Sequence, residues 1–136
     1  MRTPNNKLAR LLLLFIKKMA WFYISCSGGM NMKKIECIVQ NKKFNDLESA
    51  LRAVGVAGMT VSEVKGFGNE QTRPDSYLFL PKTKIEIYCS ADAVENIVKT
   101  IIDVCQTGNL GDGKIAIFDI QELIRIRTEE RGAVAI

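Results

Sequence analysis

The feature that most constrains the fold is a strand-then-helix pattern that occurs twice from residue 32 onward. Residues 34–40 alternate as a strand does, and residues 45–54 then carry apolar side chains at helical spacing. The same succession returns as a strand over 82–89 and a helix over about 91–106. Two such units in one chain of 136 residues favour a single α+β domain.

Further strand patterns cover 59–65, 114–120 and about 124–127, which completes the order β-α-β-loop-β-α-β-β. This order predicts a ferredoxin-like fold, βαββαβ, with an added C-terminal strand. Two helices would cover one face of the sheet and leave the other open. Depending on register, the open face of the second and third strands would carry Ser62, Val64, Ile85 and Ile87 or their neighbours. A partly apolar open face favours self-association, so we expect a closed cyclic oligomer.

The charge and the reactive side chains exclude several classes of function. The formal net charge of +4 comes from residues 1–31, which hold five basic and no acidic residues; the rest holds 14 basic and 15 acidic residues. A nearly neutral domain gives no indication of nucleic-acid binding. The chain has no histidine, which excludes histidine acid–base catalysis and most catalytic zinc sites. None of its four cysteines forms a C-x-x-C pair, so we predict no metal site and a reducing, cytoplasmic location.

Residues 1–31 allow three interpretations. Basic residues ahead of the apolar stretch 11–16 are typical of a signal peptide, but two lysines end the stretch before a membrane span could form. The basic and aromatic content also fits an interfacial amphipathic helix. In the third interpretation the codons of Gly28 and Gly29 are a bacterial ribosome-binding site, and translation starts at Met30 or Met32. We therefore divide the chain into a leader that is disordered or not translated and a domain over 32–136.

Residues 107–114 form a glycine-rich run, with three glycines within six positions and a closing Lys114. Such a backbone brings its N–H groups close to an anion, and the lysine adds a charge suited to phosphate. The run matches the first seven positions of a Walker A loop, but Ile115 stands where that loop needs a hydroxyl for magnesium. It also follows a helix and opens a strand, the reverse of a Walker loop. A P-loop NTPase is thereby excluded, which leaves a phosphate-binding loop or an ordinary glycine-rich turn.

The stretch 32–136 resembles the PII signal-transduction proteins (nitrogen regulatory PII-like) along its whole length. The resemblance is carried by five segments in the family's order: 32–35, 58–68, 79–82, 107–115 and 124–128. Only residues 1–31 fall outside it.

The resemblance implies a homotrimer of ferredoxin-like subunits, with an adenine nucleotide, ATP or ADP, in each of three clefts between subunits. Magnesium would accompany ATP, and no resident cofactor or catalytic residue is implied. The phosphates would be held by Gly111, Asp112, Gly113 and Lys114, together with Lys82 and with Arg125 and Arg127 of the neighbouring subunit. The adenine and ribose side would be lined by Thr60, Gly66, Phe67 and Gly68.

Two departures from the family pattern concern the signalling loop, or T-loop, between the second and third strands. Residues 69–78 are several fewer than in typical members, so the segment with the tyrosine that is uridylylated in many bacteria is missing; Tyr77 is interpreted as an anchor at the loop base. Glu70 stands where members have a glutamine that orients magnesium and 2-oxoglutarate, and Gln71 comes one place late. A glutamate there disfavours 2-oxoglutarate. The candidate effector-binding residues are Glu70, Gln71 and Lys82.

The leading hypothesis is a non-enzymatic nucleotide sensor that regulates a partner protein in nitrogen or carbon metabolism through residues 69–78, with a membrane transporter as one candidate partner. The alternative within regulation is a carboxysome- or bicarbonate-linked regulator of inorganic-carbon uptake that senses ADP or AMP with bicarbonate. Two other classes are weaker: slow ATP hydrolysis, which has no histidine base, and a membrane-anchored structural subunit, which depends on residues 1–31.

Overall fold

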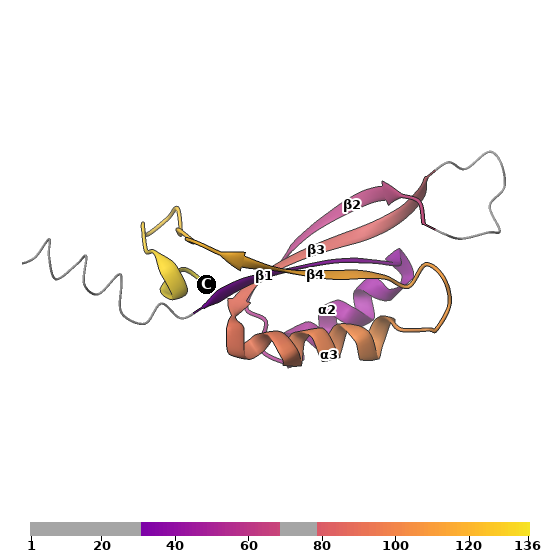
Figure 1. Ribbon diagram of the computed structural model, residues 1–136, viewed down its shortest axis with the longest axis horizontal. Helices are drawn as coiled ribbons and strands as arrows, with labels where there is room; N and C mark the ends of the chain where they lie inside the picture. Colours follow the sequence, from indigo (N-terminus) through magenta and orange to yellow (C-terminus); the bar gives the residue numbers. More distant parts are fainter. Residues whose placement is uncertain (1–30, 69–78) are drawn as a thin grey trace, which may run out of the picture.

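The computed structural model describes residues 31–68 and 79–136, and these form an α+β layer of one sheet and two helices (Figure 1). In chain order the elements are β1 (Met32–Val39), α2 (Phe44–Ala53), β2 (Thr60–Gly66), β3 (Leu80–Ser90), α3 (Val94–Cys105) and β4 (Gly113–Ile120). Short 3-10 turns over Asn41–Lys43 and Ala91–Ala93 lead into the two helices, and a third covers Gly132–Ala135.

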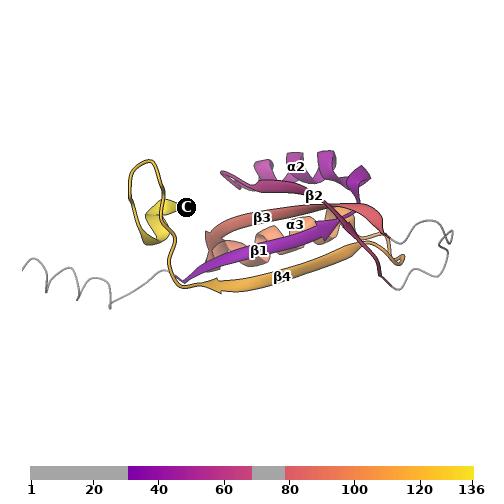
Figure 2. The same cartoon turned by 90° about the horizontal axis from the view of Figure 1, so that it is seen from above.

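The four strands form one antiparallel sheet in the order β2-β3-β1-β4, and both helices lie on the same face of it (Figures 1 and 2). This arrangement confirms the predicted ferredoxin-like fold. Within the described ranges α2 and α3 have 10 and 12 residues, and no helix there has the length and apolar character needed to cross a membrane.

The core lies between the helices and the two central strands. Ile35 and Cys37 of β1 stand opposite Ile87 and Ile85 of β3, and all four side chains are at most 1% exposed. Burial of one such aliphatic side chain contributes roughly 1.5–3 kcal/mol. The register corrects the expected open face, because opposite residues of an antiparallel pair share a face. Ile85 and Ile87 therefore face the helices.

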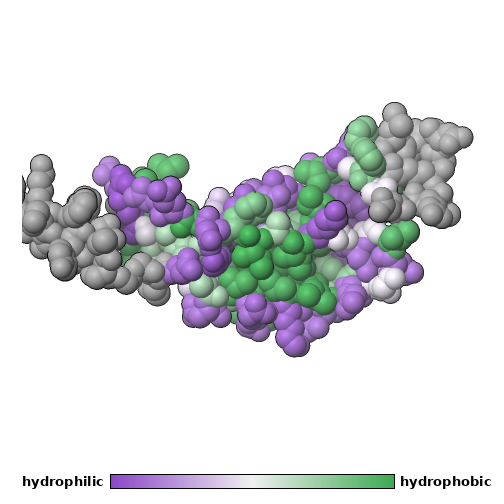
Figure 3. Space-filling model, viewed as in Figure 1, coloured by the Kyte–Doolittle hydropathy of each residue, from purple (hydrophilic) through white to green (hydrophobic). Residues whose placement is uncertain are grey.

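The helices contribute their apolar stripes to the same core. The buried side chains are Leu47 and Leu51 on α2 and Val94, Ile97, Ile101 and Cys105 on α3, as the helical spacing predicted. Gly55 ends α2 with a φ of +92°, a conformation that costs little only for glycine. Ile102 of α3 and Ile117 of β4 remain 42% and 48% exposed, and Figure 3 shows an apolar area over these two elements.

The open face of the sheet carries an alternating charge network at its centre. Lys34 and Lys84 both form ion pairs with Glu36 and with Glu86, at 3.2 Å for Lys84–Glu36 and 3.3 Å for Lys34–Glu36. The hydrogen bond from Lys34 lowers the pKa of Glu86, and that same bond raises the pKa of Lys34. The Lys34 amine also lies 5.8 Å from the centre of the Phe118 ring. This face is therefore charged at its centre, with the aromatic ring of Phe118 beside the charges.

The predicted fifth strand is wrong. Residues 124–127 contribute only an isolated bridge, between Ile124 and Arg131, and the chain then turns. The N–H groups of Thr128 and Glu129 both donate to the carbonyl of Arg125, at 3.3 and 2.8 Å, which closes a tight turn. Alternating Ile and Arg residues had suggested a strand, but the main-chain carbonyl of Arg125 is engaged in this turn and not in a strand ladder.

Candidate functional site

The glycine-rich run connects α3 to β4 and is the centre of the candidate site. Gly108, Gly111 and Gly113 have φ values of +81°, +97° and +116°, all in the region that favours glycine. Gly113 also sits against the neighbouring strand, because a Cβ placed on it would lie 1.8 Å from the carbonyl oxygen of Ile38. The run is therefore a specific loop conformation that its sequence enforces.

The carboxylate of Asp112 organises this loop from within. It accepts hydrogen bonds from the main-chain N–H groups of Thr107 and Gly108, at 2.7 and 2.9 Å, and from the Thr107 hydroxyl. The hydrogen bonds from Thr107 hold the pKa of Asp112 below its usual range. A longer contact of 3.4 Å joins the carboxylate to the side-chain amide of Gln40. The carboxylate therefore turns toward its own loop, and the main chain is what the loop offers to an anion.

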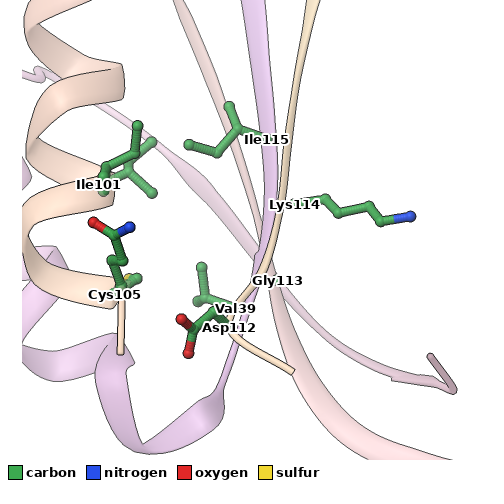
Figure 4. Close-up of a pocket in the computed structure, with 9 residues that line it drawn as sticks. Val39, Ile101, Cys105, Asp112, Gly113, Lys114 and Ile115 are labelled. Atoms are coloured by element: carbon green, nitrogen blue, oxygen red, sulfur yellow. The ribbon is translucent and has the colours of Figure 1, made fainter. Parts of the chain in front are cut away.

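Two lysines flank the run on the open face of the sheet. Lys82 of β3 donates from its amine to the carbonyl of Gly111, at 3.0 Å, and so ties β3 to the loop. Lys114, the first residue after the last glycine, lies in register with Ile38 and extends away from the helices (Figure 4). Its side-chain amine forms no hydrogen bond or ion pair with any residue in the described ranges. This end of the sheet therefore offers a cation beside a glycine loop.

A cavity of about 350 Å³ lies under the run, between α3 and β4 (Figure 4). Its lining is mostly apolar and includes Val39, Ile101, Cys105 and Ile115. Burial raises the pKa of the Cys105 thiol, so this thiol stays protonated at neutral pH. Because the cavity lies on the helix side of β4 and Lys114 points to the other side, the cavity is an extension of the core and not a phosphate site.

Within one chain, the residues that were predicted to line adenine and ribose do not all lie together. Gly66 ends β2, and Phe67 and Gly68 follow it at the same end of the sheet as Lys82. The Phe67 ring is 70% exposed and meets the Phe79 ring edge-on, with centroids 5.7 Å apart. Thr60 begins β2 six residues earlier, about 20 Å away at the usual rise of a strand.

The two predicted arginines also lie far from the lysines of the same chain. Arg125 and Arg127 follow β4, whereas Lys114 stands at its start, and the eight residues of β4 span about 24 Å. Figure 2 shows the C-terminal segment and the α3–β4 connection at opposite ends of the sheet. Arg127 is exposed and makes no hydrogen bond or ion pair within the described part of the chain. Arg125 instead pairs with Glu130.

Three of the predicted residues, Glu70, Gln71 and Tyr77, lie outside the described residues. Two contacts that organise the site were not predicted from the sequence: the Thr107–Asp112 hydrogen bonds and the engagement of Arg125 by Glu130. A threonine at the entrance of the run, followed five residues later by an aspartate, was the available signal for the first, because short polar side chains commonly bond nearby main-chain groups.

Comparison with known proteins gives consistent matches. The family model for nitrogen regulatory protein P-II matches residues 32–130. The chain is 48% identical over 112 residues to nitrogen regulatory protein P-II of Klebsiella oxytoca and to nitrogen regulatory protein P-II 1 of Escherichia coli, covering 77% of this chain and 100% of each relative.

Comparison with solved structures points to the same family. The Bacillus subtilis GlnK–ATP complex matches with a TM-score of 0.70 at 34% identity, over 81% of this chain and 100% of that one. Arabidopsis thaliana PII bound to citrate matches with a TM-score of 0.67 at 40% identity, over 78% of this chain and 92% of that one. The chain therefore belongs to the nitrogen regulatory protein P-II family, whose members are signalling regulators and not enzymes.

Proposed function

We propose that this protein is a cytoplasmic adenine-nucleotide sensor that works as a cyclic homotrimer, with one nucleotide in each cleft between neighbouring subunits. The observation that carries the proposal is the division of the cations between the two ends of β4. Lys82 and Lys114 flank the glycine loop at one end, and Arg125 and Arg127 follow the other end. A second copy is needed to bring arginines to the loop.

A polyphosphate would require the cations from both ends of β4. Main-chain N–H groups of a glycine loop and several cations are what its oxygens need. The exposed apolar side chains over α3 and β4, among them Ile102 and Ile117, offer surface that a neighbouring subunit would cover. The match to a GlnK–ATP complex supports ATP or ADP as the ligand, with magnesium accompanying ATP.

Calorimetric titration with ATP, ADP and AMP tests the proposal directly. Lys114→Ala and Arg127→Ala should each weaken ATP binding by roughly tenfold to a hundredfold, the usual loss for one hydrogen bond to a charged group. Lys99→Ala is the matched control, because it removes a lysine from the exposed side of α3, where Lys99 pairs with Asp103. Light scattering should show trimers for all three variants.

The proposal fails if the wild type binds no adenine nucleotide at micromolar concentrations. It also fails if the two site variants bind ATP as tightly as Lys99→Ala does.

The same titrations, repeated with 2-oxoglutarate and with bicarbonate, test the effector. We propose that residues 69–78 report the nucleotide state to a protein partner of nitrogen or carbon metabolism, such as a membrane transporter. Glu70 would repel the doubly charged 2-oxoglutarate more strongly than the singly charged bicarbonate, so of the two effectors it disfavours 2-oxoglutarate more. A gain in ATP affinity with 2-oxoglutarate but not with bicarbonate would contradict this preference and remove the inorganic-carbon alternative.

A further inference from the structure

The guanidinium of Arg125 is already engaged by its own chain. Its Nη1 forms an ion pair with the Glu130 carboxylate, and its Nη2 donates to the main-chain oxygens of Val134 and Ile136, at 3.0 and 2.9 Å. An arginine offers a phosphate two parallel N–H groups along one edge, and each of its two such edges includes Nη2. Because both Nη2 hydrogens already donate hydrogen bonds, Arg125 has no free edge for bidentate binding of a phosphate.

The acceptors belong to a closed structural unit. The Arg125 N–H donates to the Glu130 carbonyl at 2.9 Å, and the Gly132 N–H donates to the Leu123 carbonyl at 2.9 Å. The Thr128 hydroxyl donates to the same Glu130 carboxylate at 2.7 Å. These bonds hold residues 132–136 beside Arg125 in a defined position.

Apolar contact also holds this segment. Ala133 and Ile136 help to line a cavity of about 340 Å³, whose other walls include Val56, Ile87 and Ile97. Ile136 is 40% exposed, so more than half of its surface is covered. Residues Gly132–Ala135 form a 3-10 turn that contains no buried residue, and such weakly covered segments are among the first parts of a fold to open. None of residues 132–136 belongs to a strand of the sheet, so displacement of the segment breaks no strand pairing.

Arg127 differs from Arg125 in this respect. Arg127 is exposed, and its guanidinium donates to no acceptor within the described residues. Arg127 is therefore available to a phosphate at once, whereas Arg125 becomes fully available only when Val134 and Ile136 are displaced.

We propose that residues 132–136 are an intramolecular competitor for Arg125, displaced when nucleotide phosphates take the guanidinium. This inference rests on the proposed function, in which Arg125 faces the nucleotide of a neighbouring subunit. Docking of the segment and binding of the nucleotide then oppose each other, and by linkage each weakens the other by the same factor. The phosphate state in the cleft would thereby be reported at the outer end of the sheet as well as through residues 69–78.

Two variants test the competition by calorimetry with ATP. A chain that ends at Ala133 lacks both main-chain acceptors, and Glu130→Gln keeps the chain length but removes the charge that holds Nη1. Each should raise ATP affinity by about threefold to tenfold, the value of one or two released hydrogen bonds. Glu129→Gln is the matched control, because it removes the same charge from the neighbouring exposed residue and should leave affinity unchanged.

Hydrogen exchange of the full chain gives an independent readout. Saturating ATP should speed amide exchange in residues 132–136 by at least about threefold, since a released segment loses its bonds. The inference is overturned if exchange there is slower or unchanged with ATP, or if Glu130→Gln binds ATP no more tightly than Glu129→Gln. Those results leave the proposed function standing when the wild type still binds ATP. Absence of ATP binding by the wild type would instead overturn both.

Discussion

Replacement of Gly113 by alanine should be the most damaging small change in the glycine-rich run. A Cβ at this position would lie 1.8 Å from the carbonyl oxygen of Ile38, 2.9 Å from its carbonyl carbon and 3.3 Å from the Cα of Val39. All three atoms belong to the main chain of β1, so no side-chain rotation relieves the overlap. The first pair of the β1–β4 ladder, Val39 with Gly113, would have to separate.

The expected cost has two parts. Gly113 has a φ of +116°, and holding an L-residue in a left-handed conformation costs roughly 1–2 kcal/mol. Forcing an extra methyl into packed structure costs typically about 1–3 kcal/mol. Together these predict that Gly113→Ala lowers the free energy of unfolding by roughly 2–5 kcal/mol.

Two other glycines separate these parts experimentally. Gly108 has a φ of +81°, but no atom lies within 4 Å of the position that a Cβ would take, so Gly108→Ala should show the conformational cost alone, about 1–2 kcal/mol. Gly58 has open space around it and no positive φ, so Gly58→Ala should be neutral or stabilising by up to about 1 kcal/mol. Urea denaturation of all three variants at one protein concentration measures the series, because unfolding of an oligomer depends on concentration.

The order of the series decides between the two causes. If Gly113→Ala costs no more than Gly108→Ala, the close approach of β4 to Ile38 is not what requires glycine there. ATP titration of the same variants adds a second measure, because displacement of β4 at Gly113 would also displace Lys114.

Three further predictions concern single residues. Glu129 is a non-glycine residue with a φ of +57°, so Glu129→Gly should raise the free energy of unfolding by about 0.5–1 kcal/mol in urea denaturation; a decrease would contradict the assigned strain. The pKa of Asp112 is lowered in the folded state, so its contribution to stability is present above the ordinary aspartate pKa of 3.8 and is lost as the pH falls through the lower folded value. The stability difference between wild type and Asp112→Asn should therefore shrink below pH 3.8, and a difference that stays constant down to pH 2 would refute this. Burial raises the pKa of the Cys37 thiol to about 12, so iodoacetamide at neutral pH should label Cys37 only after unfolding, as mass spectrometry of its peptide would show; rapid labelling of the native protein would be inconsistent with its burial.

Local periodicity predicted the two helices and the two central strands well, because each of these four elements has one buried face. The spacing of Leu47 and Leu51, and of Ile97 and Ile101, follows directly from the requirement that a helix cover the sheet. The edge strands β2 and β4 contain no buried residue and were located from their β-branched and apolar composition instead. The central strand β3 begins at Leu80, two residues before the predicted start. Its first residues pair with the end of β2, which is a long-range contact that no local pattern contains.

The errors have physical causes of the same kind. Ile85 and Ile87 were among the candidates for the open face because an alternating strand does not say which of its two faces meets the helices. The pairing with Ile35 decides this. The strand predicted over 124–127 failed because the carbonyl of Arg125 accepts hydrogen bonds from the N–H groups of Thr128 and Glu129, which closes a turn.

The glycine-rich run was predicted as a tight connection between a helix and a strand, but its internal contacts were not predicted. The glycines and Lys114 stand where the pattern indicated, since positive φ values and a tight connection are properties of the run itself. The inward orientation of Asp112 depends on how the loop folds, and the engagement of Arg125 depends on residues up to eleven positions later. Neither follows from residue types at fixed spacing.

The length of β4 has a genetic consequence. In the proposed trimer each cleft takes Lys114 from one chain and Arg127 from its neighbour, because one chain keeps these residues at opposite ends of the strand. A Lys114→Ala allele and an Arg127→Ala allele, each with weakened ATP binding alone, should then complement each other in one cell. Every mixed ring has one boundary at which an intact lysine meets an intact arginine, so co-expression restores one working cleft per mixed trimer.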